Sequence, residues 1–160
     1  MIFRSKAPLR IGLAGGGTDV SPYCDLYGGA ILNTTISHAA YASIETLDAN
    51  KIIVETLDRK EKQEFSWDTI LPIDGELNLL KGVYNRIQKD YGIKKCGIRL
   101  STFVDAPAGS GLGTSSTLVV AILGAFIEML RLPFSQYDAA HYAYDIERNN
   151  LQLAGGRQDQ

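Results

Sequence analysis

The alternation of hydrophobic and polar positions predicts an opening strand and a later one, each followed by a glycine-rich loop. Residues Phe3 to Leu13 alternate loosely and run into the cluster Gly15-Gly16-Gly17. Residues Gly97 to Val104 alternate in the same way before a second glycine-rich stretch at Pro107 to Gly113. We therefore expect two strands that each lead into a loop.

The stretch between these strands predicts a hairpin. Residues Tyr41–Leu47 and Ile52–Leu57 are rich in β-branched and aromatic side chains, and they flank a turn at Asp48-Ala49-Asn50. A third strand is expected near Phe65.

Helical spacing of hydrophobic residues predicts three helices. The first covers Leu77 to Tyr91 and stops at Gly92, and the second, Ser116 to Leu130, is apolar almost all round, as in a buried helix. Ser135 can cap the third helix. Its expected apolar face consists of Tyr137, Ala140, Ala143 and Tyr144. Strands mixed with helices indicate an α+β fold.

Composition describes an ordinary globular chain. Of the 160 residues, 45% are hydrophobic and 21% are charged, with a net charge of -2. This length suits one domain over residues 1–160, and the charge disfavours nucleic acid as a partner. The longest apolar run, Leu118 to Ile127, is too short to span a membrane, and the first residues do not resemble a signal peptide. We expect a cytoplasmic protein with reduced thiols at Cys24 and Cys96.

The segment Asp105 to Ser116 combines glycines at alternate positions with a following buried helix. Such glycines let the backbone curl so that its N–H groups form an anion-binding concavity. The helix dipole and the hydroxyls of Thr114, Ser115 and Ser116 add further groups for phosphate or Mg²⁺. The segment fits neither the Walker A pattern nor GxGxxG. A turn that only reverses the chain is the structural alternative.

Glu147 stands on the apolar side of the last predicted helix. Counting back three, four and seven residues from it gives Tyr144, Ala143 and Ala140, whereas Arg148 lies off this face. A carboxylate that points inward needs a partner. A metal ion would supply one, and pairing with an arginine or reaching to the rim are the alternatives.

Polar residues also end the first glycine loop. Thr18-Asp19 follows the strand and loop Ala7 to Gly17, a position that suits recognition of sugar hydroxyls. A simple Asx turn would give the same pattern. Asp159, after the turn Gly155-Gly156, means little by itself.

Together these segments resemble the GHMP kinases, the small-molecule kinases that include galactokinase, homoserine kinase and mevalonate kinase. Pro107 to Ser116 is similar to the family's phosphate loop, Pro-x-x-x-Gly-Leu-Gly-Ser-Ser, with Thr114 in place of the first serine. Ala-Pro-Leu-Arg10 is similar to the family's Ala-Pro-Gly-Arg/Lys. The resemblance implies the two-layer, ribosomal-protein-like fold of the family's N-terminal domain, with ATP and Mg²⁺ as cofactors.

The resemblance also implies a role for each matched residue. Asp159 would be the catalytic carboxylate, kept ionised by Arg10 beside it, and Ser115 with Glu147 would bind Mg²⁺. The phosphates of ATP would be bound by Pro107, Gly109, Ser110, Gly111, Leu112, Gly113, Thr114, Ser115 and Ser116. The sugar would be held by Gly16, Gly17, Thr18 and Asp19. Because galactokinase carries Glu-His where this chain has Gly16-Gly17, the pocket should be roomier than that of galactokinase.

Within the family, the amino-acid sequences of the two end segments and of the phosphate loop are most similar to those of the kinases of D-glycero-D-manno-heptose 7-phosphate. This implies phosphorylation of the anomeric hydroxyl of that sugar phosphate by ATP, and it allows a homodimer. The alternatives are another sugar, as in L-fucokinase or galactokinase, and a module that binds a nucleotide or phosphosugar without chemistry. A reductase that uses these glycines as a dinucleotide-binding loop is disfavoured, because the segment does not match GxGxxG. Residues 40–95 carry no chemistry that we can assign.

Family members have a second, C-terminal half. The resemblance therefore implies that these residues are an N-terminal portion that ends one residue after Asp159. We expect little or no turnover from the isolated 160 residues.

Overall fold

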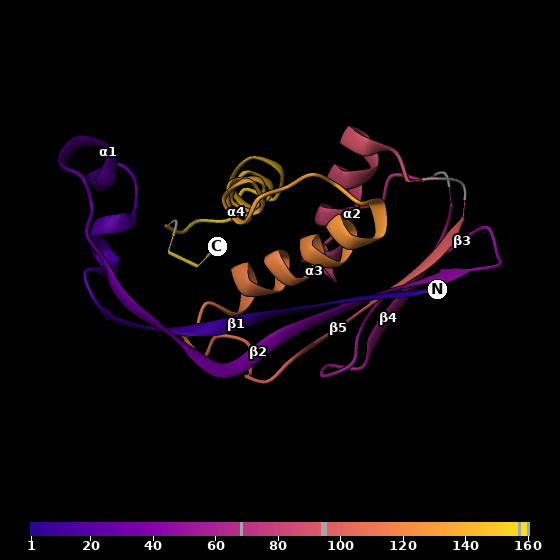
Figure 1. The fold of residues 1–160 in the computed structure, drawn as a ribbon, viewed down its shortest axis with the longest axis horizontal. Helices are drawn as coiled ribbons and strands as arrows, with labels where there is room; N and C mark the ends of the chain where they lie inside the picture. Colours follow the sequence, from indigo (N-terminus) through magenta and orange to yellow (C-terminus); the bar gives the residue numbers. More distant parts are fainter. Residues whose placement is uncertain (68, 94–95, 157, 160) are drawn as a thin grey trace.

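The computed structural model describes residues 1–67, 69–93, 96–156 and 158–159, and it confirms the α+β prediction. Five strands form one sheet in the order β1-β2-β5-β3-β4. The strands are β1 (Ile2–Ala14), β2 (Leu32–Leu47), β3 (Lys51–Thr56), β4 (Glu61–Ser66) and β5 (Gly97–Val104). The helices are α1 (Tyr23–Tyr27), α2 (Asn78–Tyr91), α3 (Thr114–Leu130) and α4 (Gln136–Asp145), with short helical turns η1 (Gly16–Asp19) and η2 (Ile146–Asn150). Helices α2, α3 and α4 lie over one face of the sheet (Figure 1).

The hairpin predicted between Tyr41–Leu47 and Ile52–Leu57 is wrong, although both segments are strands. β5 lies between them, antiparallel to β2 and parallel to β3. β3 instead forms its hairpin with β4, in which Ile52 is opposite Phe65, so the third predicted strand is confirmed. Alternation along a chain identifies a strand but not its partner, and here a strand from much later in the sequence takes the central place.

The buried character of α3 is confirmed, because the sheet covers one side of this helix and α2 and α4 cover the other. Val119, Ile122 and Phe126 are fully buried, and the Phe126 ring lies 6.5 Å from that of Tyr84 in α2. Gly124 brings α3 close to β1: a Cβ atom there would lie 2.4 Å from Oγ of Ser5. The tight contact fixes the second half of α3 against the first half of β1.

The capped start of α4 is confirmed, but one residue of its predicted apolar face is not. Ser135 and Asp138 form a reciprocal capping box. Tyr137 is 83% exposed, whereas Ala143 and Ile146 are fully buried. The helix is rotated so that positions 139, 143 and 146 face α3, which leaves the first-turn tyrosine in solvent.

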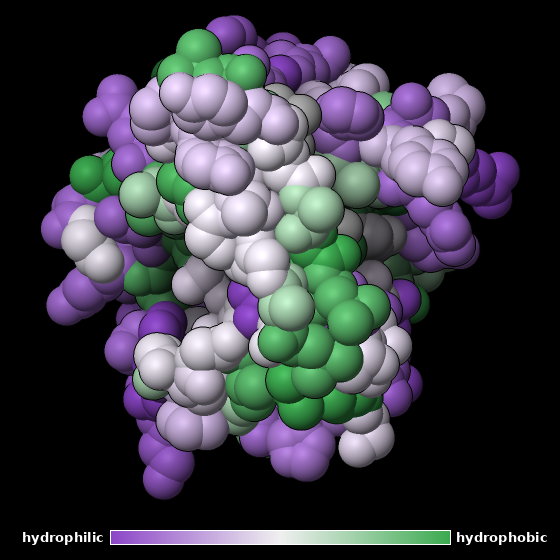
Figure 2. Space-filling view, turned by 90° about the vertical axis from the view of Figure 1, so that its left-hand side faces the viewer, coloured by the Kyte–Doolittle hydropathy of each residue, from purple (hydrophilic) through white to green (hydrophobic). Residues whose placement is uncertain are grey.

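The loops at the far end of β1 and β2 form a protrusion that contains η1 and α1 (Figure 1). Figure 2 faces this end and shows hydrophobic side chains grouped on its surface. The exposed large hydrophobic residues here are Ile11, Leu13, Val20, Tyr23, Leu26, Tyr27 and Leu32. Cys24 and Cys96 are not joined in a disulfide. In the part of the chain that the structure describes, no helix is long and apolar enough to cross a membrane.

Candidate active site

The loop before α3 has the predicted anion-binding geometry. Gly109, Gly111 and Gly113 all have positive φ, between 74° and 78°. Helix α3 begins at Thr114 without a side-chain cap, so its first amides point out of the helix end unpaired by a side chain. Two other loop residues make main-chain hydrogen bonds. The Ser110 amide donates to the Pro107 carbonyl, and the Leu112 carbonyl accepts from the Arg10 amide.

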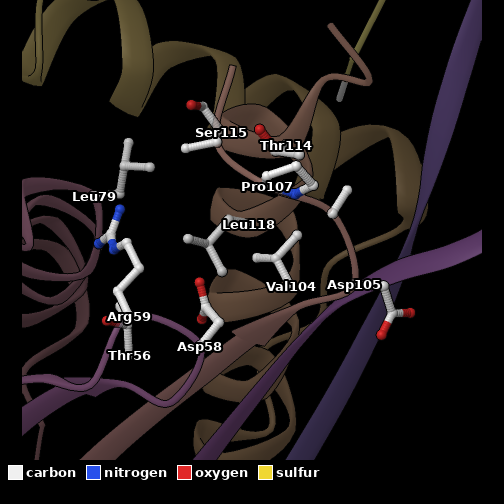
Figure 3. Close-up of a pocket in the computed structure, with 12 residues that line it drawn as sticks. Thr56, Asp58, Arg59, Leu79, Val104, Asp105, Pro107, Thr114, Ser115 and Leu118 are labelled. Carbon is white, nitrogen blue, oxygen red and sulfur yellow. The ribbon is translucent and has the colours of Figure 1, made fainter. Parts of the chain in front are cut away.

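A cavity of about 380 Å³ opens beside this loop (Figure 3). Pro107, Thr114 and Ser115 line one side of it, and Asp58 and Arg59 lie across from them. These last two residues come from the β3–β4 turn, within the stretch to which the sequence assigned no chemistry. Nothing in their local pattern distinguishes them from any polar turn, and only the parallel pairing of β3 with β5 brings that turn to the phosphate loop.

Thr56, at the end of β3, adds a second group that sequence analysis missed. Thr56 lines the same cavity, and its hydroxyl is buried and has no hydrogen-bond partner among the described residues. Asp105 points the other way, because its carboxylate accepts hydrogen bonds from the Ala39 amide at 2.9 Å and the Tyr41 hydroxyl at 3.3 Å. Asp105 therefore anchors the loop to β2, whereas the Thr56 hydroxyl is buried beside the cavity.

Asp159 and Arg10 meet at the end of the phosphate loop, as the resemblance implied. Arg10 Nε lies 2.5 Å from an Asp159 carboxylate oxygen, and Nη1 of Arg10 donates to the Gly111 carbonyl at 2.8 Å. A Cβ atom on Gly113 would lie only 3.0 Å from the Asp159 carboxyl carbon. The carboxylate is thus held against the first residue before α3, although 149 positions separate it from Arg10.

The first glycine loop lies against the segment that ends in Asp159. The Asp19 carboxylate accepts a hydrogen bond from the Gln158 amide at 2.9 Å, and Gly16 approaches the Gln158 side chain. Gly17 faces open space. Thr18 has a backbone role, since its hydroxyl accepts from the Ala30 amide at 3.0 Å and lies 2.7 Å from the Gly15 carbonyl. The structure therefore brings Asp19 to Asp159 and uses the hydroxyl of Thr18 to close the loop.

A second cavity, of about 520 Å³, adjoins Asp159 on the side of β1 and α4. Polar side chains of Asn33, Thr35 and Gln158 line it together with Arg10. The carboxylate thus has open space beside it that differs from the cavity next to Ser115. The neighbouring residues Arg157 and Gln160 lie outside the described residues.

The inward direction predicted for Glu147 is confirmed. This side chain is 1% exposed, and one carboxylate oxygen accepts a hydrogen bond from Oγ of Ser116 at 2.9 Å. Ser115, the other expected Mg²⁺ ligand, is exposed and faces the cavity. The described residues contain no group of three or more His, Cys, Asp or Glu side chains that could hold a metal ion by themselves. An ion at this helix end would need phosphate or water oxygens as well.

A cluster of charged and polar side chains around Arg86 contacts η2. Arg86 of α2 donates to Asp90 at 2.5 Å, to Asp145 at 2.6 Å and to Asn150 at 2.8 Å. The hydrogen bond from Arg86 lowers the pKa of Asp90. Hydrogen bonds from Asn149 and then Arg86 lower the pKa of Asp145. Both aspartates therefore stay ionised well below neutral pH, and the bonds from Arg86 to Asp145 and Asn150 tie η2 to α2.

The GHMP kinases N terminal domain family matches residues 78–160, which is more than half of the chain. The chain belongs to the GHMP kinase family. A heptose kinase of Campylobacter jejuni, named D-glycero-alpha-D-manno-heptose 7-phosphate kinase, is 46% identical over 157 residues, which cover 98% of this chain and 46% of that protein. The L-fucokinase/L-fucose-1-P guanylyltransferase of Bacteroides fragilis is 31% identical over 97% of the chain and 18% of that protein.

Solved GHMP kinases share the fold over the whole chain. The crystal structure of a D-glycero-D-manno-heptose 1-phosphate kinase from Bacteroides thetaiotaomicron superposes with a TM-score of 0.94 at 54% identity, over 100% of this chain and 52% of that one. Galactokinase of Lactococcus lactis, solved with galactose, gives a TM-score of 0.81 at 22% identity, over 99% of this chain and 40% of that one. The chain thus spans about half the length of these two heptose kinases, and the superpositions confirm the expected N-terminal-domain fold.

Proposed function

We propose that the complete protein transfers the γ-phosphoryl group of ATP to the anomeric hydroxyl of D-glycero-D-manno-heptose 7-phosphate, for the synthesis of nucleotide-activated heptose. The observation that carries this proposal is the contact of Asp159 with Arg10 and Gly113 at the uncapped start of α3. It puts a carboxylate next to a loop that resembles the family's phosphate loop. The names of both heptose kinases support a heptose phosphate, and the name of the Campylobacter jejuni relative supports the 7-phosphate.

ATP would occupy the phosphate loop and the cavity beside it. Phosphoryl transfer depends mainly on positioning and on neutralising charge, and the loop amides with the helix dipole supply both. The nucleoside would extend past Ser115 toward Thr56 and Asp58, which also line the cavity.

Mg²⁺ would be held by Ser115 and Glu147, with Ser116 orienting the carboxylate. Hydroxyl and carboxylate oxygens are the hard donors that this ion takes, and the hydrogen bond from Ser116 brings the Glu147 carboxylate to the start of α3, where Ser115 lies. When bound, the ion neutralises charge on the transferring phosphate.

The acceptor sugar would lie between Asp159 and the loop that carries Gly17 and Asp19. Asp159 would orient the anomeric hydroxyl and accept its proton, while Arg10 keeps the carboxylate in place through its bonds to Asp159 and Gly111. Gly17 leaves room for a sugar longer than galactose. Cytoplasmic location and a homodimer remain predictions from the sequence.

The test compares sugars in the complete protein with Mg-ATP. We expect transfer to heptose 7-phosphate at least about tenfold faster than to L-fucose or galactose, with the new phosphate on C1 by ³¹P NMR; preference of this size needs about 1.4 kcal/mol. Asp159→Asn should lower kcat by about 10²- to 10⁴-fold and leave the affinity for Mg-ATP unchanged. Asp58→Asn is the matched control for charge, because it should affect the KM for ATP instead of kcat.

Faster transfer to L-fucose would contradict the sugar assignment, and the 31% identical fucokinase would then be the better guide. Unchanged kcat in Asp159→Asn would remove this residue from the mechanism. Absence of any ATP-dependent transfer would leave a nucleotide-binding module.

A further inference from the structure

Arg148 follows Glu147 in η2, and its guanidinium lies against the chain as it returns toward Asp159. Nη1 donates to the Leu153 carbonyl at 2.7 Å, and Nη2 donates to the Gly156 carbonyl at 2.9 Å. The guanidinium carbon is 5.1 Å from the centre of the Tyr144 ring. A planar fork stacked on an aromatic ring is rigid, so these two bonds fix two carbonyls three residues apart.

The segment held by Arg148 also packs tightly against the first glycine loop. A Cβ atom on Gly155 would lie 2.7 Å from Nη2 of Arg148, and one on Gly156 would lie 2.1 Å from a carboxylate oxygen of Asp19. The two glycines therefore pass between an arginine and an aspartate with no space for a side chain. This gives the Gly155-Gly156 pair a packing role that the sequence alone did not reveal.

The same segment is also held at both of its ends. The chain turns at Gln152, which has φ 54°, and the Leu153 amide then donates to the Glu147 carbonyl at 2.9 Å. Further along, Arg10 binds Asp159. Arg148 thus fixes the start of the segment and Arg10 its end, and one turn of η2 presents both Glu147 and Arg148.

We infer that Arg148 is a positioning residue for Asp159: by holding the carbonyls of Leu153 and Gly156 it sets where the carboxylate lies against the phosphate loop. This inference rests on the proposed function. Arg148 acts through the main chain, since its hydrogen bonds go to carbonyls of the segment and not to Asp159. Misplacement of a reacting group by about 1 Å can lower a rate by about 10²-fold.

The test is a double-mutant cycle in the complete protein. Arg148→Met should lower kcat by about 10- to 100-fold while the KM for Mg-ATP changes less than about twofold, because the phosphate loop is untouched. In the Asp159→Asn background the same change should have less than about a twofold effect, since the carboxylate it positions is gone. Arg148→Lys keeps one donor and should restore part of kcat.

Arg86→Met is the matched control. This substitution removes another arginine that holds η2, through Asp145 and Asn150. Among the described residues, the side-chain hydrogen bonds of Arg86 go to residues 90, 145 and 150 and not to the segment held by Arg148. A loss of kcat as large in Arg86→Met as in Arg148→Met, or equal losses from Arg148→Met with and without Asp159, would overturn the positioning role.

Hydrogen exchange separates this inference from the proposed function, because it needs no activity. Amides of residues 151–159 should exchange faster in Arg148→Met than in the wild type or in Arg86→Met, while those of 110–116 stay unchanged. Equal exchange in 151–159 would overturn the Arg148 contact as the support of the segment. Faster exchange in a protein without phosphoryl transfer would overturn the proposed function and, with it, the catalytic meaning of the contact.

Discussion

Replacing Gly113 by alanine tests the contact between the phosphate loop and Asp159. Gly113 has φ 74°, where an L residue costs about 1–2 kcal/mol, and its added Cβ would lie 3.0 to 3.3 Å from three atoms of the Asp159 carboxylate. Gly109 and Gly111 have φ 78° and 75° but nothing within 4 Å of such a Cβ. These two glycines therefore report the backbone cost alone.

We expect Gly109→Ala and Gly111→Ala each to lower the free energy of unfolding by about 1–2 kcal/mol. Gly113→Ala should lose about 1 kcal/mol more, because the carboxylate must move off the hydrogen bond that it makes with Arg10 at 2.5 Å, and such charged bonds contribute about 1.5–3 kcal/mol. In a chain of this size the extra loss corresponds to about 2–4 °C in Tm.

Urea unfolding followed by circular dichroism, without ligands, measures these differences. The decisive comparison repeats all three substitutions in the Asp159→Ala background, where the extra cost of Gly113→Ala should disappear. An equal loss at all three glycines, or an excess that survives without the Asp159 carboxylate, would refute the packing of Asp159 on Gly113.

Two further predictions concern the other polar contacts. Ser116→Ala removes the hydroxyl that donates to the buried Glu147 and should lower the free energy of unfolding by about 1–3 kcal/mol. Replacing the exposed Ser115 by alanine should leave the free energy of unfolding unchanged but weaken Mg-ATP binding in calorimetry; equal stability losses would contradict this. Because Arg86 lowers the pKa of Asp90, the pair stabilises the fold above the unfolded-state pKa of about 3.9, and this contribution is lost as pH falls through the lower folded-state pKa. The difference in unfolding free energy between wild type and Arg86→Met should thus be full at pH 7 and shrink below about pH 4, and a difference independent of pH would speak against it.

Local patterns predicted most elements of the fold and failed on their pairing. The strand Gly97–Val104 and the helix ending at Tyr91 lie where periodicity placed them. The hairpin of Tyr41–Leu47 with Ile52–Leu57 failed because two neighbouring strands can be joined by a short turn and still have a third strand between them. A local sequence pattern does not show which strand pairs with which.

The residues of the candidate site were likewise predicted only in part from the sequence. The phosphate loop was visible because its chemistry lies in a short segment of unusual composition, whereas the role of Arg10 came from family resemblance. The positions of Asp19 and Asp159 came from family resemblance, and the structure brings both to one place. Asp58 and Arg148 were missed, since an ordinary turn aspartate and an ordinary helix arginine acquire a role only from what the fold sets beside them.

The place of β5 has a consequence for how the protein is made. As residues leave the ribosome, β1 with β2 and β3 with β4 can form two separate hairpins, each with an inner edge that β5 later covers. Neither inner edge is paired until Gly97–Val104 has been synthesised and enters between them, parallel to β3 and antiparallel to β2. Between the end of β4 at Ser66 and the end of β5 at Val104, the nascent chain therefore exposes two edges that can bind other strands. The phosphate loop follows β5 in the sequence, so the ligand-binding loop is made only after the strand that closes the sheet.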